Sequence, residues 1–492
     1  MSKIFIIGSG FSGLSAACYL SASGHEVHVF EKNETAGGRA RQLKTTAGYV
    51  FDMGPSWYWM PGVFEKFFSD FGYRVSDLYE LKLLSPSFDI VFGPGDTLEV
   101  PDNPEKLYSM FESLEPGSAA RLKKFMAEAE YKYKTGMEDL VYKPGLSVAE
   151  FADVRVIKGL FRLQIFSSFS KHIRKYFSHP KLIALLEFPV LFLGAMPEDT
   201  PALYSLMNYA GLMLGTWYPA GGFGKVVDAM VKVAASNGTV FHYNAPVEKI
   251  IVENNLVAKI QVNGMAMACD AIVAAADYHH VESALLPKAF RNYSENYWDK
   301  KTMAPSCLIF YLGINKKLKS LHHHTLFFDE DLGQHASEIY KKPQWPAKPL
   351  FYACCTSKTD DGVAPEGHEN LFLLMPVAPG LVDSEEIRDK YFQIIITRLE
   401  EKLNETISTH IDFKQSYCVN DFTLDYNSYK GNAYGLANTL LQTANLRPKI
   451  RNKKIKNMVY AGQLTVPGPG VPPALVSGKV ASLQLLKYLN AN

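Results

Sequence analysis

Three glycines and one glutamate near the N-terminus have the spacing of a dinucleotide-binding motif. An apolar run from Lys3 ends at Gly8, and Gly10 and Gly13 follow at the start of a stretch with helical spacing. Gly8 permits a tight turn, Gly10 lets a pyrophosphate approach the backbone, and Gly13 allows the helix to pack closely on the sheet. Glu31 ends the next apolar run, where a carboxylate accepts hydrogen bonds from ribose hydroxyls and disfavours a 2′-phosphate. The predicted ligand is therefore FAD or NAD rather than NADP.

Further glycine-rich segments favour FAD. Gly37 and Gly38 precede Arg39, and a loop of this kind lets the backbone cross the diphosphate while the guanidinium neutralises it. A glycine-rich turn at 462–470 leads into a C-terminal helix, whose dipole suits the flavin pyrimidine ring. The residues expected to bind FAD are Gly8, Gly10, Phe11, Ser12, Gly13, Glu31, Lys32, Gly38, Arg39, Gly54, Pro55, Ser56, Trp57, Val247, Asp277, Gly462, Val471 and Pro472.

The composition argues against several classes of protein. Lys and Arg total 51 against 50 Asp and Glu, so there is no charge excess that would favour nucleic acid as a partner. Six scattered cysteines without a C-x-x-C spacing fit a reducing cytosol. The longest apolar stretch, 182–196, contains Glu187 and Pro189 and is too short to span a bilayer. Because a strand is predicted to begin at Lys3, no room is left for a signal peptide, and we expect a cytoplasmic protein.

Two segments need a choice between interpretations. Residues 166–177 interleave basic and aromatic side chains, which is typical either of a buried helical bundle or of a membrane-facing patch. Residues 322–324 are three consecutive histidines. Since neighbouring residues do not face one point on a helix or a strand, we expect a solvated loop there, and we predict no metal site.

The chain is long enough for more than one core. The predicted fold class is α/β, with a discontinuous Rossmann-like FAD-binding domain, a mixed-sheet substrate domain and a helical region that associates with a membrane. The expected ranges are 1–75, 220–290 and 422–492 for the FAD-binding domain, 76–103 and 291–421 for the sheet domain, and 104–219 for the helical region.

Four separated segments resemble the bacterial-type carotenoid desaturases, the phytoene desaturases in particular, within the amine-oxidase-like superfamily of FAD flavoproteins. These segments are GSGFSGLSAACYL with FEKNETAGGRA, FDMGPSWYWMP, GTWYPAGGFGKVVDAM and YAGQLTVPGPGVPPALVSGKVAS. The last one departs from the family pattern, because Gln463 replaces a small residue and Pro473 replaces a glycine. Within the desaturases, the WYWMP loop is more similar to phytoene desaturases than to relatives that act on hydroxycarotenoids.

The resemblance implies a reaction. A hydride leaves an allylic CH₂ of a linear, phytoene-like C40 polyene for the flavin, a proton leaves the neighbouring carbon, and a trans double bond forms. It also implies peripheral docking on the inner face of the cell membrane. Because the sequence has no second strand–GxGxxG–helix unit for a nicotinamide cofactor, we expect quinone or oxygen as the electron acceptor. Asp153 matches an acidic position proposed as acid or base in the family, although a helix N-cap explains this residue equally well. No cysteine lies between residues 419 and 492 for covalent attachment, so FAD is expected to bind noncovalently.

Other members of the superfamily offer alternatives. These are a desaturase of a hydroxylated or cyclised carotenoid, a carotenoid isomerase, another flavoenzyme such as an amine or porphyrinogen oxidase, and a non-catalytic prenyl-protein escort. Escort proteins dispense with an intact flavin site, whereas Gly8, Gly10, Gly13, Glu31 and Arg39 are all present here.

Overall fold

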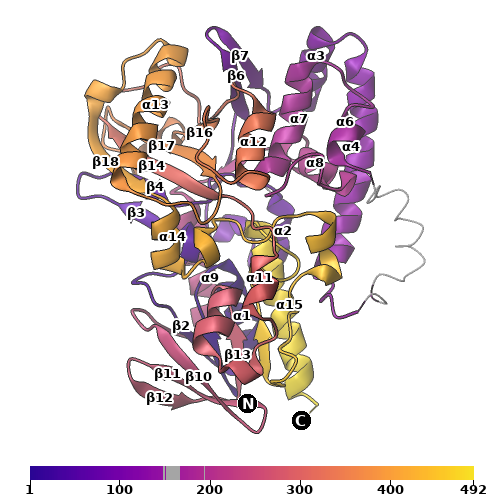
Figure 1. Cartoon of the computed structure of the whole chain (residues 1–492), viewed down its shortest axis with the longest axis vertical. Helices are drawn as coiled ribbons and strands as arrows, with labels where there is room; N and C mark the ends of the chain where they lie inside the picture. The colour runs from indigo at the N-terminus through magenta and orange to yellow at the C-terminus, as the bar shows by residue number, and fades with distance from the viewer. Residues whose placement is uncertain (148–149, 151–166, 193, 492) are drawn as a thin grey trace.

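A five-stranded parallel sheet forms the part of the molecule that holds both chain termini (Figure 1). The structure is a computed structural model that describes residues 1–147, 150, 167–192 and 194–491. The strand order is β19-β13-β1-β2-β9. The strands are β1 (Lys3–Ile7), β2 (Glu26–Phe30), β9 (Val240–His242), β13 (Ala271–Ala274) and β19 (Met458–Tyr460). Three distant stretches of the chain therefore meet in one sheet.

Both faces of this sheet are buried, which explains why β1 is a continuous apolar run. Ile4 and Ile6 contact the hydrophobic core under three helices, and Phe5 and Ile7 contact the core on the other face. The helices are α1 (Phe11–Ala22), α9 (Phe223–Ser236) and α15 (Val471–Leu489). The opposite face is covered by α10 (Tyr278–His280), α11 (Glu295–Asp299) and an antiparallel meander of β10 (Val247–Glu253), β11 (Leu256–Val262) and β12 (Met265–Ala268).

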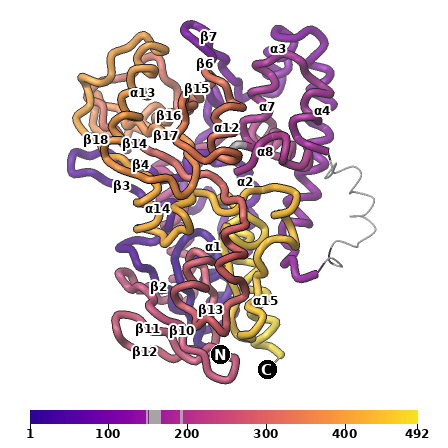
Figure 2. Tube along the Cα trace, viewed as in Figure 1, coloured from indigo at the N-terminus to yellow at the C-terminus, as the bar shows by residue number. Residues whose placement is uncertain are grey.

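A seven-stranded mixed sheet forms the other half of the molecule (Figures 1 and 2). Its order is β18-β14-β17-β16-β15-β6-β7, and only the pair β15–β6 is parallel among the described strands of this sheet. The strands are β6 (Phe88–Gly93), β7 (Asp96–Val100), β14 (Ser306–Ile314), β15 (His324–Phe327), β16 (Phe351–Cys354), β17 (Glu369–Val377) and β18 (Ile411–Tyr417). Helix α13 (Glu385–Leu403), which Ser384 caps, packs on one face. The other face is turned toward the helical region and the hairpin β3 (Gln42–Lys44) and β4 (Val50–Asp52).

The helical region packs its aromatic side chains inward. Phe169, Ile173 and Phe177 are buried in one hydrophobic core, and His172 is 1% exposed. Of the two interpretations of 166–177, the membrane-facing patch is therefore wrong for these side chains, and the described part belongs to a buried bundle. Its helices are α3 (Pro104–Leu114), α4 (Ser118–Lys134), α6 (Phe169–Ile173), α7 (Pro180–Phe192) and α8 (Leu206–Leu212).

Further short elements complete the fold. They are α2 (Pro61–Ser69), α12 (Leu332–Tyr340), α14 (Val419–Tyr426) and the paired strands β5 (Leu81–Leu83) and β8 (Trp217–Pro219). The architecture is a mixed α/β fold, and the domain limits given above stay a prediction. Within the ranges that the structure describes, no helix combines the length and apolar character that crossing a bilayer requires.

Candidate functional site: a flavin cradle beside an apolar cavity

The glycine turn after β1 has the geometry that a bound pyrophosphate needs. Gly8 has a φ of +96°, which favours glycine. A Cβ on Gly13 would lie 2.0 Å from the carbonyl oxygen of Gly8, so only glycine fits there. A Cβ on Gly10, by contrast, would meet no protein atom within 4 Å. Phe11 and Ser12 begin α1 directly after this open position, and the backbone N–H groups of this helix end favour an anion.

The second glycine loop lies against the first. The Gly37 amide donates to the Ser9 carbonyl over 2.9 Å, and a Cβ on Gly38 would lie 3.1 Å from Gly10 Cα. The third loop crosses the second, because a Cβ on Gly54 would lie 2.7 Å from the carbonyl oxygen of Arg39. Three segments that the sequence singled out separately are thus in contact.

The C-terminal loop closes the same site. A Cβ on Gly462, whose φ is +120°, would lie 3.4 Å from Ser12 Oγ. Val471 and Pro472 form the first turn of α15, and Pro at this position costs no helical hydrogen bond. Helices α1 and α15 lie side by side (Figure 1), and a Cβ on Gly478 would overlap the Ser12 carbonyl oxygen at 2.3 Å. This close approach packs the first turn of α1 against the eighth residue of α15. Because the two helices follow parallel strands of one sheet, their positive N-terminal ends both point to the same edge of that sheet.

The acid at the end of β2 is held firmly. Glu31 is 5% exposed, and its carboxylate accepts hydrogen bonds from the Ser9 amide (2.9 Å) and hydroxyl (2.8 Å) and from the Asn33 amide and side chain (both 3.0 Å). The Ala245 amide donates to the Glu31 carbonyl over 2.8 Å, which brings Val247 to this end of the sheet. Lys32 follows, and burial lowers its pKa. Contacts of these residues with ribose and adenine stay a prediction.

Arg39 lies between the second glycine loop and the segment 428–432, which the sequence analysis did not identify. Its Nη2 donates to Ser428 Oγ (3.0 Å) and to the Asn432 carbonyl (3.2 Å), whereas its Nε is buried without a hydrogen-bond partner. Burial raises the pKa of Asp277, and the charge of Arg39 opposes that rise. The Asp277 side chain also caps α10 by accepting from the His280 amide over 3.2 Å.

These residues fit FAD. The open space at Gly10, the unpartnered Nε of Arg39 and the two helix N-termini at this edge of the sheet are together complementary to a diphosphate. FAD would be held by the glycine loops, with its adenosine near Glu31 and Val247 and its flavin near the 54–57 loop and α15.

A polar chain connects the 54–57 loop to the seven-stranded sheet. Pro55 precedes Ser56, whose hydroxyl lies 3.0 Å from the Tyr352 hydroxyl; this in turn lies 2.6 Å from His324 Nδ1. The His324 ring stacks on Trp57 with centroids 4.1 Å apart. Burial holds the pKa of His324 well below its usual range, so the ring is neutral.

The expectation of a solvated loop at 322–324 is wrong for two of its three residues. His323 and His324 are 4% and 0% exposed, and only His322 faces solvent. The reason is that β15 begins at His324 and lies between β16 and β6 in the sheet. No local signal distinguishes such a strand from a loop, because its pairing partners are distant in the sequence.

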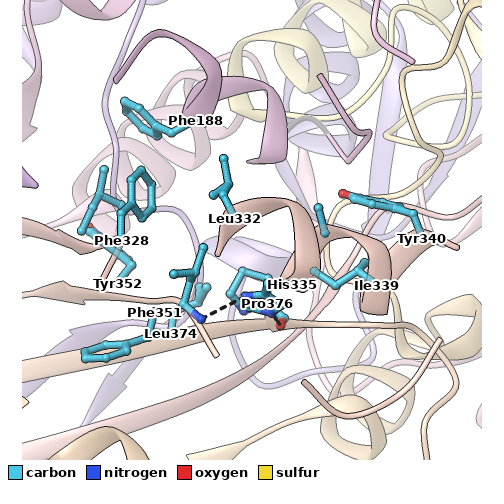
Figure 3. A pocket seen from close by; sticks show the side chains of 13 residues that line it. Phe188, Phe328, Leu332, His335, Ile339, Tyr340, Phe351, Tyr352, Leu374 and Pro376 are labelled. Atoms are coloured by element: carbon cyan, nitrogen blue, oxygen red, sulfur yellow. Dashed lines mark hydrogen bonds between the residues drawn. The ribbon is translucent and has the colours of Figure 1, made fainter. Parts of the chain in front are cut away.

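An apolar cavity opens beside this polar chain (Figure 3). It contains about 540 Å³ of space free of protein atoms, counting space open to solvent. Phe188, Phe328 and Tyr352 line one side, and Leu332, Ile339 and Tyr340 line the side formed by α12. The remaining lining residues are Leu326, His335, Ala336, Leu350, Phe351, Leu374 and Pro376. Such a wall binds an apolar ligand by shape, as it offers few polar groups.

Asp153, proposed as an acid or base, lies outside the residues that the structure describes. The sequence analysis identified neither Tyr352 nor a role for His324 beside the 54–57 loop. Ser56 and Tyr352 are 296 positions apart, so only the fold brings them together.

The chain is similar in sequence to known flavoproteins and in fold to a solved one. The sequence profile of the family described as flavin containing amine oxidoreductase matches residues 11–486. The carotenoid 3,4-desaturase of Haloarcula japonica is 39% identical over 485 residues, which are 98% of each chain. The zeta-carotene-forming phytoene desaturase of Myxococcus xanthus is 29% identical over 498 residues, which are 99% of this chain and 95% of that protein. A solved structure of putrescine oxidase bound to putrescine shares the fold, with a TM-score of 0.63, 13% identity and 99% of each chain covered.

Proposed function

Because this chain belongs to the flavin-containing amine oxidoreductases and, within them, to the carotenoid desaturases, we propose that it introduces double bonds into a linear carotenoid with noncovalently bound FAD. The observation that carries the proposal is the apolar cavity next to the 54–57 loop. A hydrocarbon polyene has no polar group that a protein can hydrogen-bond, so it must be positioned by the shape of an apolar wall. Phe188 lines this cavity and also contacts Trp57, with ring centroids 6.0 Å apart.

FAD, when bound, supplies the acceptor for a hydride from an allylic CH₂ group. The chain itself must position the polyene, exclude water and receive the proton that leaves the neighbouring carbon. Phe188 and Phe328, which line the cavity, position the polyene and exclude water. One candidate is the pair of Tyr352 and His324, whose hydroxyl oxygen and Nδ1 lie 2.6 Å apart beside the cavity. Burial holds the pKa of His324 well below its usual range, so this imidazole is a weak base. Asp153 is the other candidate, from the family resemblance alone.

Two substrates are consistent with the family. The WYWMP loop favours phytoene, as the sequence suggests. The 39% identity to a carotenoid 3,4-desaturase, against 29% to a phytoene desaturase, favours a carotenoid that is desaturated near its end.

Expression in bacterial hosts that accumulate single carotenoids tests the proposal. One host would accumulate phytoene, and others would accumulate more desaturated or hydroxylated carotenoids. We expect products with longer conjugated systems in at least one host, separated by pigment chromatography and absent from an empty-vector control. Unchanged pigments in every host, or geometric isomers alone, would refute desaturation.

We also propose docking on the inner face of the cell membrane, through a surface other than the bundle. Four exposed leucines, Leu146, Leu440, Leu441 and Leu446, lie on two segments that pack together. Lys449 Nζ joins these segments, since it donates to the Gly145 carbonyl (2.7 Å) and to the Asn445 carbonyl (2.9 Å). Exposed apolar side chains of this kind insert into a lipid interface.

The double variant Leu441→Asp/Leu446→Asp tests this surface. It should reduce co-sedimentation with liposomes and leave FAD content unchanged. The matched control is Val382→Asp/Leu424→Asp, because Val382 and Leu424 are 79% and 72% exposed elsewhere on the molecule. If both double variants bind liposomes like the wild type, the leucine surface does not dock.

For the electron acceptor we propose quinone or oxygen, since the sequence has one strand–glycine–helix unit for a dinucleotide. Anaerobic mixing of the reduced protein with a soluble quinone should restore the flavin absorbance rapidly. Rapid bleaching of the oxidised protein by NADH would instead identify a nicotinamide partner.

A further inference from the structure

A buried arginine lies against the C-terminal glycine loop. Arg447 is 2% exposed, and its Cζ lies 3.0 Å from the position that a Cβ on Gly468 would take. Its Nη1 donates to the Gln463 carbonyl over 3.4 Å. Its Nη2 donates to the Leu436 carbonyl over 3.4 Å and to Asn438 Oδ1. The guanidinium therefore touches the loop that leads into α15.

No carboxylate among the residues that the structure describes forms an ion pair with Arg447, whose acceptors are all neutral oxygens. Its Nε is buried without a hydrogen-bond partner. Burial lowers the pKa of Arg447 to about 10, which still leaves it charged at neutral pH. Two other enclosed arginines, Arg41 and Arg388, differ, since Arg41 pairs with Asp425 and Arg388 with Asp383.

A buried charge without a counter-ion among the described residues is costly, so its presence favours an anion that binds there. Gly468 lies just before α15, which begins at Val471. The loop that leads into α15 thus carries the positive end of this helix and is contacted by the Arg447 guanidinium. The flavin pyrimidine ring is expected at this loop. That ring collects negative charge when the cofactor is reduced.

We propose that Arg447 offsets the negative charge that FAD gains on reduction and so makes it a stronger oxidant. This inference rests on the flavin binding as proposed above. In the reaction two electrons and one proton pass together from the substrate to FAD, and the second substrate hydrogen leaves as a proton. FAD therefore gains one negative charge. Arg447 acts through its field on the cofactor and does not touch the substrate.

This role suits the reaction. Removing a hydride from a hydrocarbon without activating groups needs an acceptor that is easily reduced. A charge in a low-dielectric interior acts over several ångströms with little screening, so direct contact with the ring is not required.

The test is the midpoint potential of the flavin in the purified FAD-bound protein, measured by dye equilibration without any carotenoid. Arg447→Gln removes the charge and keeps hydrogen-bonding groups. We expect it to weaken binding of reduced FAD relative to oxidised FAD at least tenfold, which lowers a two-electron potential by about 30 mV. Arg447→Lys keeps the charge and should retain most of the wild-type potential. Arg451→Gln is the matched control, because Arg451 is exposed in the same segment.

A second variant covers the case in which Arg447→Gln loses its cofactor. Asn438→Asp keeps Arg447 but places a carboxylate on its Nη2, and it should lower the potential as well. An unchanged potential in the FAD-bound charge-altering variants would overturn the proposal and leave Arg447 as a structural link between two loops. Because no carotenoid is used, this result is independent of whether the protein desaturates one.

Discussion

Gly10 differs from the other glycines of the cofactor loops. A side chain on Gly13 or Gly54 would collide with a backbone carbonyl oxygen, at 2.0 Å and 2.7 Å. Gly10 has an extended backbone, with a φ of −68° and a ψ of 177°, that any residue adopts, and a Cβ there would meet no protein atom within 4 Å. Neither the conformation nor the packing of the protein therefore requires glycine at this position. The remaining reason for a glycine at position 10 is the space that a bound diphosphate needs.

Gly10→Ala should accordingly separate cofactor binding from folding. The free energy of unfolding of the apoprotein should change by less than about 0.5 kcal/mol. The Kd for FAD should rise at least tenfold, about 1.4 kcal/mol, in a flavin fluorescence titration. Gly62→Ala is the matched control, since a Cβ on Gly62 also meets nothing within 4 Å, and it should change neither quantity. Wild-type FAD affinity in Gly10→Ala would place the diphosphate elsewhere.

At the scale of elements, Asp52 links the β3–β4 hairpin to the N-terminus of α9. Its carboxylate accepts hydrogen bonds from the Phe223 amide and from Gln42 Nε2, both over 2.9 Å. Burial raises the pKa of Asp52 from 3.8 to about 6, although these hydrogen bonds oppose the rise. A carboxyl whose pKa is raised on folding stabilises the folded state only where it stays protonated.

This linkage predicts the pH dependence of stability at Asp52. Its contribution is fully present below the unfolded pKa of 3.8 and is lost as the pH rises through about 6. The free energy of unfolding of the wild type relative to Asp52→Asn, from urea titrations, should therefore fall between about pH 4 and pH 6 and then stay level. A difference that is constant over this range, or that grows with pH, would show that Asp52 is not destabilised by burial.

Local patterns predicted many elements well. The Asn254–Asn255 and Asn263–Gly264 turns separate β10, β11 and β12, and Ser384 caps α13. Each of these features depends on a few adjacent residues. The glycine turn after β1 was also predictable, since the backbone conformation at Gly8 and the close packing at Gly13 require glycine. The burial of His323 and the contact of Ser56 with Tyr352 were not, because they depend on pairing between distant segments.

At the scale of the whole molecule, the two sheets have different roles. The parallel sheet, assembled from three distant stretches, places the glycine loops and the two helix N-termini at one edge. The mixed sheet presents an aromatic face and the apolar cavity to the 54–57 loop, which crosses between them. A flavin held by the first sheet would then face an apolar substrate on the second. On this arrangement, we expect the reaction to need both halves of the molecule.

An anaerobic single turnover tests the central claim most directly. The FAD-bound protein would be mixed with its carotenoid in liposomes, with flavin absorbance followed and pigments then separated by chromatography. The account predicts that the flavin bleaches while the carotenoid gains conjugation, with one new double bond for each flavin reduced and no change in a preparation stripped of FAD. Formation of geometric isomers without bleaching, or a product that forms equally well without FAD, would contradict it.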